Sequence, residues 1–250
     1  MINIVICGAN GKMGQKVAQA IAETDDMRVC CGVDLFPDAK QNDFPVYTYI
    51  EECEAPFDVV VDFSRPDALE SNLAFAIKKQ AAIVICTTGF SDDDKAKILQ
   101  AAEKTPVFFT ANMSLGVNLQ MELAKKAAEF LGEAYDIEII EKHHNQKVDS
   151  PSGTALAIAE HINEAFDGSK EFVYGRHSKT DKRDREIGIH GVRGGTIVGE
   201  HTVLFAGTDE IIEIKHAAQS RNVFAHGALR AAKFLAGKPA GLYGMADMLK

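Results

Sequence analysis

Short apolar runs alternate with longer amphipathic segments along the first part of the chain. The apolar runs have the length of strands and occupy residues 2–7, 27–33, 59–63, 82–86 and 107–110. Between them apolar residues recur at helical spacing, for example at Leu69, Leu73 and Ile77. Regular alternation of strand and helix is typical of a doubly wound sheet, because each helix returns the chain to a parallel strand. We therefore predict an α/β fold with an N-terminal Rossmann-type doubly wound sheet.

The pattern changes in the second part of the chain. A helix is predicted over residues 117–131 and a strand over residues 135–141. Three β-rich runs follow later, at residues 187–192, 196–205 and 210–216. Strands in succession predict a second α+β domain with a mixed or antiparallel sheet. A last helix, over residues 222–235, is expected to pack back on the first domain.

The composition is that of a soluble globular protein, with 46% hydrophobic and 25% charged residues among 250. A net charge of −9 argues against nucleic acid as a partner. There is no polybasic patch and no apolar run of ~20 residues, so we expect no membrane association. The first apolar run lacks a basic leader and a cleavage site, and we interpret it as a strand and not a signal peptide.

The cysteines lie mostly in apolar, strand-like contexts, at Cys7, Cys30, Cys31, Cys53 and Cys86. Their spacing matches no metal-binding motif, and no Cys/His pair accompanies the adjacent histidines His143 and His144, so we expect no metal site. An odd number of mostly buried thiols fits a reducing compartment. We therefore expect free thiols and a cytoplasmic protein.

Glycines follow the first predicted strand directly, in the spacing Gly8-x-x-Gly11-x-x-Gly14. Such glycines let the backbone approach a pyrophosphate, which the start of the next helix then holds. Asp34 lies 20 residues past Gly14, where a carboxylate can accept hydrogen bonds from the adenosine ribose. Asn10 stands where a further glycine is usual, and asparagine tolerates left-handed backbone. The segment predicts a dinucleotide site; the alternative is a glycine-rich turn without a ligand.

Two histidines and a lysine, His143, His144 and Lys147, lie between a predicted strand and a predicted helix. Ser150 is a plausible N-cap of that helix, and Pro151 suits its first position. The free amides that open the helix would then lie beside the lysine, which makes a site for a carboxylate or phosphate. Histidines exchange protons near neutral pH. Because adjacent residues on a strand face opposite ways, one histidine could instead be a plain surface residue.

Other segments have open interpretations. The turns at residues 86–89 and 110–114 follow predicted strands, so they either face a cofactor or serve as plain connections. Residues 176–186 carry both signs of charge and form either a solvated loop or a contact between subunits. Arg193 with two following glycines is either a turn, which we favour, or a second anion contact.

Together these motifs resemble those of one family. The segments Glu141-Lys142-His143-His144, Lys147-Val148-Asp149 and Pro151-Ser152-Gly153-Thr154-Ala155 are similar to the signature of the 4-hydroxy-tetrahydrodipicolinate reductases, formerly dihydrodipicolinate reductases. The glycine loop and residues 86–90, 111–118 and 198–202 also resemble that family, so the similarity covers essentially the whole chain. The resemblance implies NAD(P)H-dependent reduction of 4-hydroxy-tetrahydrodipicolinate to tetrahydrodipicolinate with loss of water, in lysine and diaminopimelate biosynthesis.

The resemblance also implies roles for residues. His143 corresponds to the catalytic histidine and Lys147 to the proton-donating lysine, and which of them delivers the proton stays open. The residues expected to hold the substrate are His144, Ser152, Gly153 and Thr154. The residues expected to hold the dinucleotide are Gly8, Ala9, Asn10, Gly11, Lys12, Met13, Asp34, Cys86, Thr87, Thr88, Thr110, Ala111, Asn112 and Met113. The implied domains are residues 1–114 and 218–250 for the dinucleotide and residues 115–217 for substrate binding and assembly into a homotetramer.

Three positions depart from many members of that family. Cys86 stands where glycine is common, Met113 where phenylalanine is common, and Leu35 where some relatives carry an arginine for the 2′-phosphate of NADP. Asp34 should accept the ribose hydroxyls of NADH and repel that phosphate, whereas Lys12 could reach it. We expect both NADH and NADPH to work, with NADH modestly preferred.

Two other functions stay open on the sequence. Another two-domain dehydrogenase of amino or imino acids would share the first domain. Under that alternative, the motif at residues 141–155 would have to be a coincidence. A dinucleotide-sensing regulator would bind cofactor without turnover, and the chain has no basic DNA-reading element.

Overall fold

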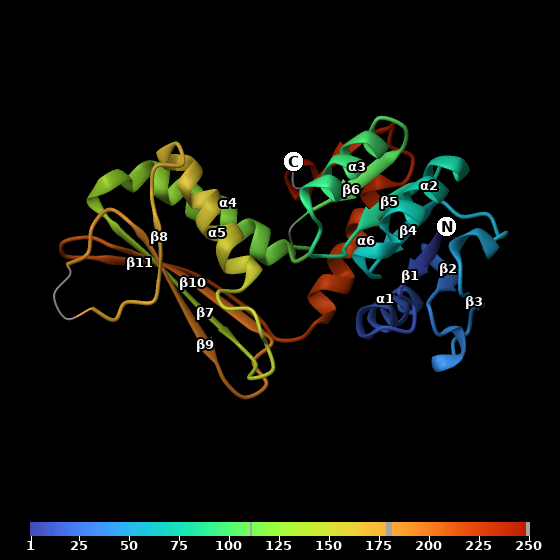
Figure 1. Cartoon of the computed structure of the whole chain (residues 1–250), viewed down its shortest axis with the longest axis horizontal. Coiled ribbons are helices and arrows are strands. Elements are labelled where there is room, and N and C mark those ends of the chain that lie inside the picture. Colours follow the sequence, from blue (N-terminus) through green and yellow to red (C-terminus); the bar gives the residue numbers. More distant parts are fainter. Residues whose placement is uncertain (111, 179–181, 249–250) are drawn as a thin grey trace. The chain divides into compact units, whose positions relative to one another are not determined.

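The computed structural model describes residues 1–110, 112–178 and 182–248. The chain divides into two compact units, of which one comprises Met1–Ser114 and Arg221–Lys250 and the other Leu115–Ser220. The return to the first unit therefore falls at residue 221, where the sequence analysis placed it at residue 218. Each unit has its own sheet and its own buried core (Figure 1).

The first unit is built on a seven-stranded parallel sheet in the order β12-β6-β5-β4-β1-β2-β3. Its strands are β1 (Ile2–Cys7), β2 (Met27–Val33), β3 (Val46–Tyr47), β4 (Val59–Asp62), β5 (Ala82–Ile85), β6 (Pro106–Phe109) and β12 (Gly241–Tyr243). Its helices are α1 (Lys12–Ala22), α2 (Leu69–Lys79), α3 (Asp92–Ala102), α6 (Asn222–Leu235) and α7 (Met245–Met248). The strand order reverses between β1 and β4, which confirms the predicted Rossmann-type sheet.

Burial on both faces explains why the central strands form continuous apolar runs. Every residue of β4 and β5 is buried, and Val60, Ile83 and Ile85 belong to one core cluster. The last helix, α6, packs against α1 in this unit, as the sequence analysis expected. The analysis missed β3 and β12, because strands of two and three residues are too short to show a period.

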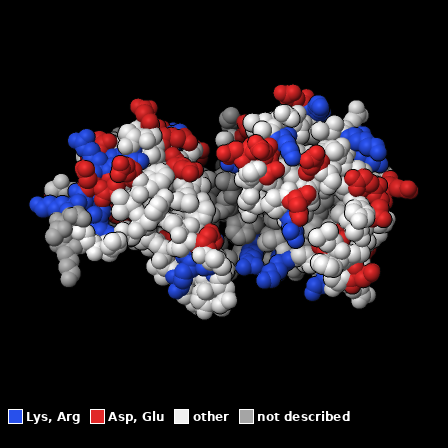
Figure 2. Space-filling model, viewed as in Figure 1, with Lys and Arg blue, Asp and Glu red and all other residues white. Residues whose placement is uncertain are grey.

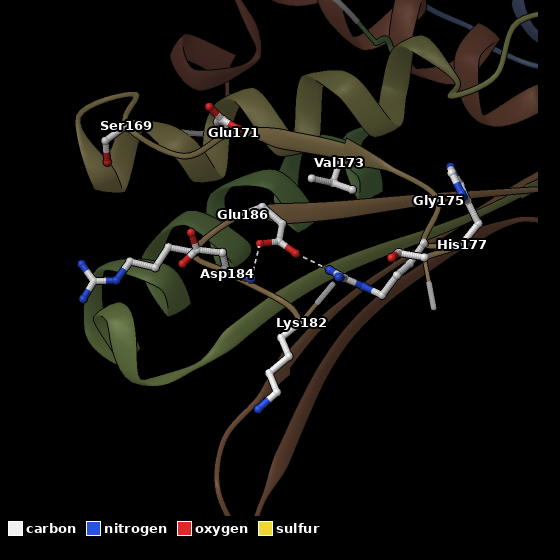
Figure 3. Close-up of a pocket in the computed structure, with 11 residues that line it drawn as sticks. Ser169, Glu171, Val173, Gly175, His177, Lys182, Asp184 and Glu186 are labelled. Atoms are coloured by element: carbon white, nitrogen blue, oxygen red, sulfur yellow. Dashed lines mark hydrogen bonds and ion pairs between the residues drawn. The ribbon is translucent and has the colours of Figure 1, made fainter. Parts of the chain in front are cut away.

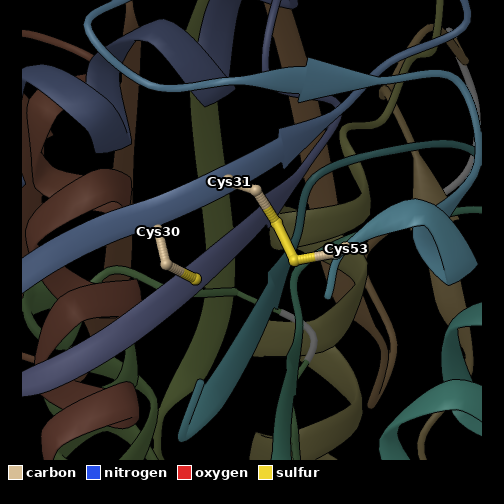
Figure 4. Close-up of side chains that lie close together, drawn as sticks. All are labelled: Cys30, Cys31 and Cys53. Atoms are coloured by element: carbon tan, nitrogen blue, oxygen red, sulfur yellow. A yellow bond between two sulfur atoms is a disulfide. The ribbon is translucent and has the colours of Figure 1, made fainter. Parts of the chain in front are cut away.

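A disulfide in the first unit corrects the sequence analysis. Cys31 of β2 is bonded to Cys53, and both are fully buried (Figure 4). The expectation of free thiols is therefore wrong for these two, and the free cysteines are Cys7, Cys30 and Cys86. This pair could not be predicted from the sequence, because the two residues are 22 positions apart and come together only when the chain folds.

The second unit carries a five-stranded sheet in the order β11-β10-β7-β9-β8. Its strands are β7 (Asp136–His143), β8 (Phe172–Tyr174), β9 (Ile187–Arg193), β10 (Gly199–Ala206) and β11 (Ile211–Ala218), and its helices are α4 (Leu115–Leu131) and α5 (Gly153–Asn163). β7 pairs with β10 antiparallel and with β9 parallel, which confirms the predicted mixed sheet. Both helices cover the same face (Figure 1), where Ile139, Ile158 and Val203 share a core.

The rest of the described chain consists of loops and short 3₁₀ helices. These are η1 (Pro37–Ala39), η2 (Ile50–Glu52), η3 (Pro66–Ala68), η4 (Gly132–Ala134) and η5 (Glu164–Phe166). Figure 2 shows acidic side chains on both units with basic ones among them, in keeping with the net charge of −9. Within the described ranges, no helix combines the length and the apolar character needed to span a bilayer.

Candidate active site

β7 carries the first residues of the candidate site. Its side chains alternate between the two faces of the sheet, so Glu141 and His143 are buried while Lys142 lies on the other face, near Glu200. His144 follows the end of the strand and is half-buried. Neither histidine is therefore a plain surface residue.

Glu141 is completely buried and connects three other residues of the site. Arg193, the last residue of β9, donates hydrogen bonds of 2.7 Å to both of its oxygens. His143 Nδ1 lies 2.6 Å from Oε2, and the Ser152 amide donates to Oε1 at 3.0 Å. Burial raises the pKa of Glu141, but these partners outweigh it and the pKa lies below its ordinary value. The chain turns at Gly195 and Thr196, as favoured, and the Arg193 side chain also binds a buried carboxylate of the chain itself, which the sequence analysis did not predict.

His143 is held at one ring nitrogen, and its other ring nitrogen lies close to a glycine. The contact with Glu141 assigns the ring proton to Nδ1. Nε2 faces Gly199, where an added Cβ would lie 3.0 Å from it. Burial lowers the pKa of His143, Glu141 opposes that shift, and the charges of Lys147 and Arg193 lower the pKa further. The imidazole is therefore mainly neutral at pH 7.

A second buried histidine, His201 of β10, packs against the first. The two rings meet edge to face with 5.2 Å between their centroids. His201 Nε2 lies 3.2 Å from Ser152 Oγ. Burial lowers the pKa of His201 to about 4, so this ring is also neutral at pH 7. The sequence analysis did not select His201 as a site residue, and its only signal was the resemblance at residues 198–202.

The helix α5 begins later than its expected cap. Ser152 is the N-cap, and its hydroxyl accepts a hydrogen bond of 3.2 Å from the Ala155 amide. Ser150 and Pro151 precede the helix and its cap, so their predicted cap and first-turn positions are wrong. Ser152 is held at the helix start because Glu141, 11 residues earlier in the sequence, binds its amide.

The donors at the start of α5 are used by the chain itself. Lys147 Nζ lies 2.9 Å from Asp149 Oδ1. Lys147 lowers the pKa of Asp149 most, and the backbone amide of Gly153 lowers it further. Gly153 is exposed, and a Cβ added there meets nothing within 4 Å, so this end of the helix is accessible to a ligand. The expected free amide of Ser152 is not free, because it binds Glu141.

In the first unit, the glycine loop connects β1 to α1. Gly8 has a φ of +76°, and a Cβ on Gly14 would lie 2.1 Å from the Gly8 carbonyl oxygen, so both positions require glycine. The Asp34 carboxylate accepts from the Asn10 amide at 2.9 Å and from the Phe36 amide at 3.1 Å. A tight backbone loop, a helix start and a carboxylate at the next strand's end fit a dinucleotide.

The turns after β5 and β6 combine packing residues with accessible ones. Thr87 is buried, and its hydroxyl lies 3.3 Å from Asp62, a buried carboxyl at the end of β4 that the sequence analysis missed. Met113 is buried against Gly227 of α6. Of the remaining residues of these turns, Cys86, Thr110 and Asn112 are half-buried and Thr88 is exposed. Ala111 lies outside the described residues.

A cavity of about 550 Å³ lies elsewhere on the second unit (Figure 3). It is lined by residues of the charged run, including Arg176, Lys182 and Glu186. Arg176 forms an ion pair with Glu186, which Figure 3 labels among the lining residues, and the burial of Glu186 against this partner fits a structural role. None of the predicted site residues lines this cavity.

Potential metal ligands come together at one place among the described residues. Cys30, Cys31 and Cys53 have sulfur atoms within 4.8 Å of one another. Because two of them form the disulfide, they do not offer thiolates to a metal ion.

Two family models match this chain, and they meet next to the first boundary between the two units, at residues 114 and 115. A family model described as "Dihydrodipicolinate reductase, N-terminus" matches residues 2–113, and one described as "Dihydrodipicolinate reductase, C-terminus" matches residues 116–249. A 4-hydroxy-tetrahydrodipicolinate reductase of Caldanaerobacter subterraneus subsp. tengcongensis is 51% identical over 253 residues, covering 100% of this chain and 99% of the relative. The enzyme of the same name from Clostridium novyi is 46% identical, with coverage of 100% and 99%.

A solved structure is also similar over nearly the full length. It is a dipicolinate-bound dihydrodipicolinate reductase from Paenisporosarcina sp. TG-14, with a TM-score of 0.80 and 26% sequence identity. The match covers 98% of this chain and 97% of that one.

Proposed function

This chain belongs to the dihydrodipicolinate reductase family, and we propose that residues 141–154 bind and protonate the substrate while the glycine loop of the first unit holds the dinucleotide. The activity is NAD(P)H-dependent reduction of 4-hydroxy-tetrahydrodipicolinate to tetrahydrodipicolinate with loss of water, in lysine and diaminopimelate biosynthesis. The assignments of individual residues rest on the geometry of each unit.

Dinucleotide binding is assigned to the carboxyl ends of the strands in the first unit. The residues that would hold it are Gly8, Ala9, Asn10, Gly11, Lys12, Met13, Asp34, Thr88, Thr110 and Asn112, and Ala111 is retained from the family resemblance. Cys86, Thr87 and Met113 would act through their backbone and packing, because Thr87 and Met113 are buried. When bound, the cofactor supplies the hydride.

Substrate binding is assigned to the start of α5. The substrate carries two carboxylates, and Lys147 with the Gly153 amide supplies the positive end that one of them needs. Thr154 and His144 are half-buried next to these donors in the sequence and complete the assignment. Ser152 acts indirectly, since it caps the helix and holds its amide on Glu141.

Proton delivery is assigned to Lys147, and the observation that carries this is the 2.6 Å contact between His143 and Glu141. With its proton on Nδ1 and a lowered pKa, His143 presents a lone pair at Nε2 and therefore accepts a proton more readily than it donates one. An ammonium group always has a proton to give. His143 then orients the reacting groups and can take up a proton between turnovers.

The test is oxidation of NADH and NADPH with the substrate made fresh by the synthase that precedes this step. The proposed enzyme consumes cofactor only when that substrate is present. A sensor would bind cofactor and turn nothing over. Another dehydrogenase would consume cofactor with a different amino or imino acid, and either outcome would refute the proposal.

Assembly into a homotetramer is assigned to the uncovered face of the second sheet. α4 and α5 cover one face, while Ile140 of β7 and Leu204 of β10 lie on the other and are only half-buried. Ile211 of the edge strand β11 is 64% exposed. Apolar residues on an uncovered face and edge favour contact with further copies of the chain. Light scattering coupled to size exclusion tests this, and a monomer would contradict it.

A cytoplasmic site of action stays a prediction. The Cys31–Cys53 disulfide argues against this prediction, because disulfides are rare in reducing compartments.

A further inference from the structure

Asp149 uses the same donors that the proposed site offers to the substrate. Its carboxylate lies 2.9 Å from Lys147 Nζ, and after Lys147 the backbone amide of Gly153 also lowers its pKa. Resting on the proposed function of this site, we infer that Asp149 is an internal competitor of the substrate. Its carboxylate fills the position of a substrate carboxylate between turnovers and is displaced when the substrate binds.

The contact is of the kind that a ligand can displace. The side chain of Asp149 is 58% exposed and that of Lys147 is 22% exposed. Water screens such a pair, so it weakens a competing ligand by roughly fivefold at most. Lys147 and Gly153 keep the pKa of Asp149 low, so its carboxylate competes throughout the neutral range.

The backbone of Asp149 is held independently of its side chain. Its carbonyl oxygen accepts from Arg193 Nη2 at 2.6 Å, and Glu141 fixes that guanidinium in turn. The preceding residue, Val148, is 98% exposed and packs on nothing. Replacing the Asp149 carboxylate by an amide therefore removes a charge at the helix start without releasing the segment that carries Lys147.

The test is the affinity for dipicolinate, an aromatic dicarboxylate that the related Paenisporosarcina enzyme holds, measured by titration calorimetry. Asp149→Asn should bind it two- to fivefold more tightly than the wild type. The melting temperature and NADH affinity should not change. Glu160→Gln, which removes one charge from an exposed position of α5, is the matched control and should bind dipicolinate like the wild type.

Equal or weaker binding by Asp149→Asn would overturn the inference, because Asp149 would then support Lys147 and not compete with the ligand. Tighter binding by Glu160→Gln as well would also overturn it, since a general change of charge would explain both results. Lys147→Ala separates this inference from the proposed function. If Lys147→Ala binds dipicolinate like the wild type, the site itself is misplaced, whereas weaker binding there with no gain in Asp149→Asn refutes only the competitor.

Discussion

The glycine loop of the first unit and the start of α5 in the second are both helix starts that follow a strand, but they are built differently. In the loop, Gly8 and Gly14 allow backbone to pack directly on backbone. At α5, the carboxylates of Glu141 and Asp149 bind the amides of Ser152 and Gly153. A ligand of the first unit meets a preformed backbone loop, while a ligand of the second must exchange with charges of the chain. Function at α5 should therefore respond to single charges and to pH, and function at the loop much less.

Lys147 gives the largest expected effect. Lys147→Ala should fold and bind NADH normally but lose roughly 10²–10⁴-fold in kcat, because the proton donor is gone. Steady-state kinetics at saturating substrate measures this, with Lys126→Ala on the exposed side of α4 as the control. If Lys147→Ala keeps a kcat near the wild-type value, Lys147 is an ordinary surface lysine, and the two helix starts do not differ in the way described above.

Acid should destabilise the second unit through His201. Its pKa is about 4 in the folded chain and about 6.5 when unfolded, so protonation favours unfolding. The stability contributed by the neutral ring is complete above pH 6.5 and is lost as the pH falls from 6.5 to 4, by about 3 kcal/mol. Urea unfolding at pH 7 and pH 4.5 should show a smaller loss in His201→Asn than in the wild type. The exposed residue His177 gives the control, His177→Asn, which should lose as much stability as the wild type.

Replacement of Glu141 tests whether its charge orients His143, the proposed catalytic histidine. Glu141→Gln removes the group that raises the pKa of His143, so burial and the charges of Lys147 and Arg193 lower that pKa further. We expect kcat to fall roughly 10–10²-fold, which corresponds to the loss of one charge-assisted hydrogen bond. We also expect the acid limb of the pH profile of kcat to shift to lower pH. Glu138→Gln, on the other face of β7, is the control. If kcat falls but the acid limb of its pH profile does not shift, Glu141 only stabilises the fold.

The difference between the glycine loop and the start of α5 also explains how much could be predicted from the sequence. The segments with a clear period were predicted well, and α6 covers the predicted residues 222–235. The glycine loop was predicted because its geometry depends on residues that are close in the sequence. The partners at α5 were not, because Glu141 meets Arg193 across 52 positions through the pairing of β7 with β9. A second contact of Glu141, with the amide of Ser152, holds the residue that caps α5, and local preferences alone could not predict which serine this is.

Gly153 tests access to the start of α5. A Cβ added there meets nothing within 4 Å, so Gly153→Val should fold but project into the space where the carboxylate docks. KM for the substrate should rise several-fold to about tenfold, and kcat should fall less, because proton transfer is untouched. Gly194→Val adds the same side chain at another open position of this unit and serves as the control. An unchanged KM in Gly153→Val with intact folding would place the substrate elsewhere.

The smallest expected effect is the choice between NADH and NADPH. Each carboxylate oxygen of Asp34 already accepts one hydrogen bond from a backbone amide. Each can still accept a hydrogen bond from a ribose hydroxyl. A 2′-phosphate would meet this carboxylate, and Leu35, which is 60% exposed, offers it no charge. Lys12 is exposed at the start of α1 and can offset part of that repulsion in solvent.

We therefore expect kcat/KM to favour NADH by only about two- to fivefold at fixed ionic strength, because two opposed charges act on the phosphate. Lys12→Ala should widen the preference, since it removes the attraction and leaves the repulsion by Asp34. Lys16→Ala, one turn further along α1, controls for the general loss of a positive charge. A preference for NADPH that vanishes in Lys12→Ala would show that the lysine outweighs Asp34. If the preference for NADPH persists in Lys12→Ala, other residues hold the phosphate, and the first site depends on side chains more than its backbone geometry implies.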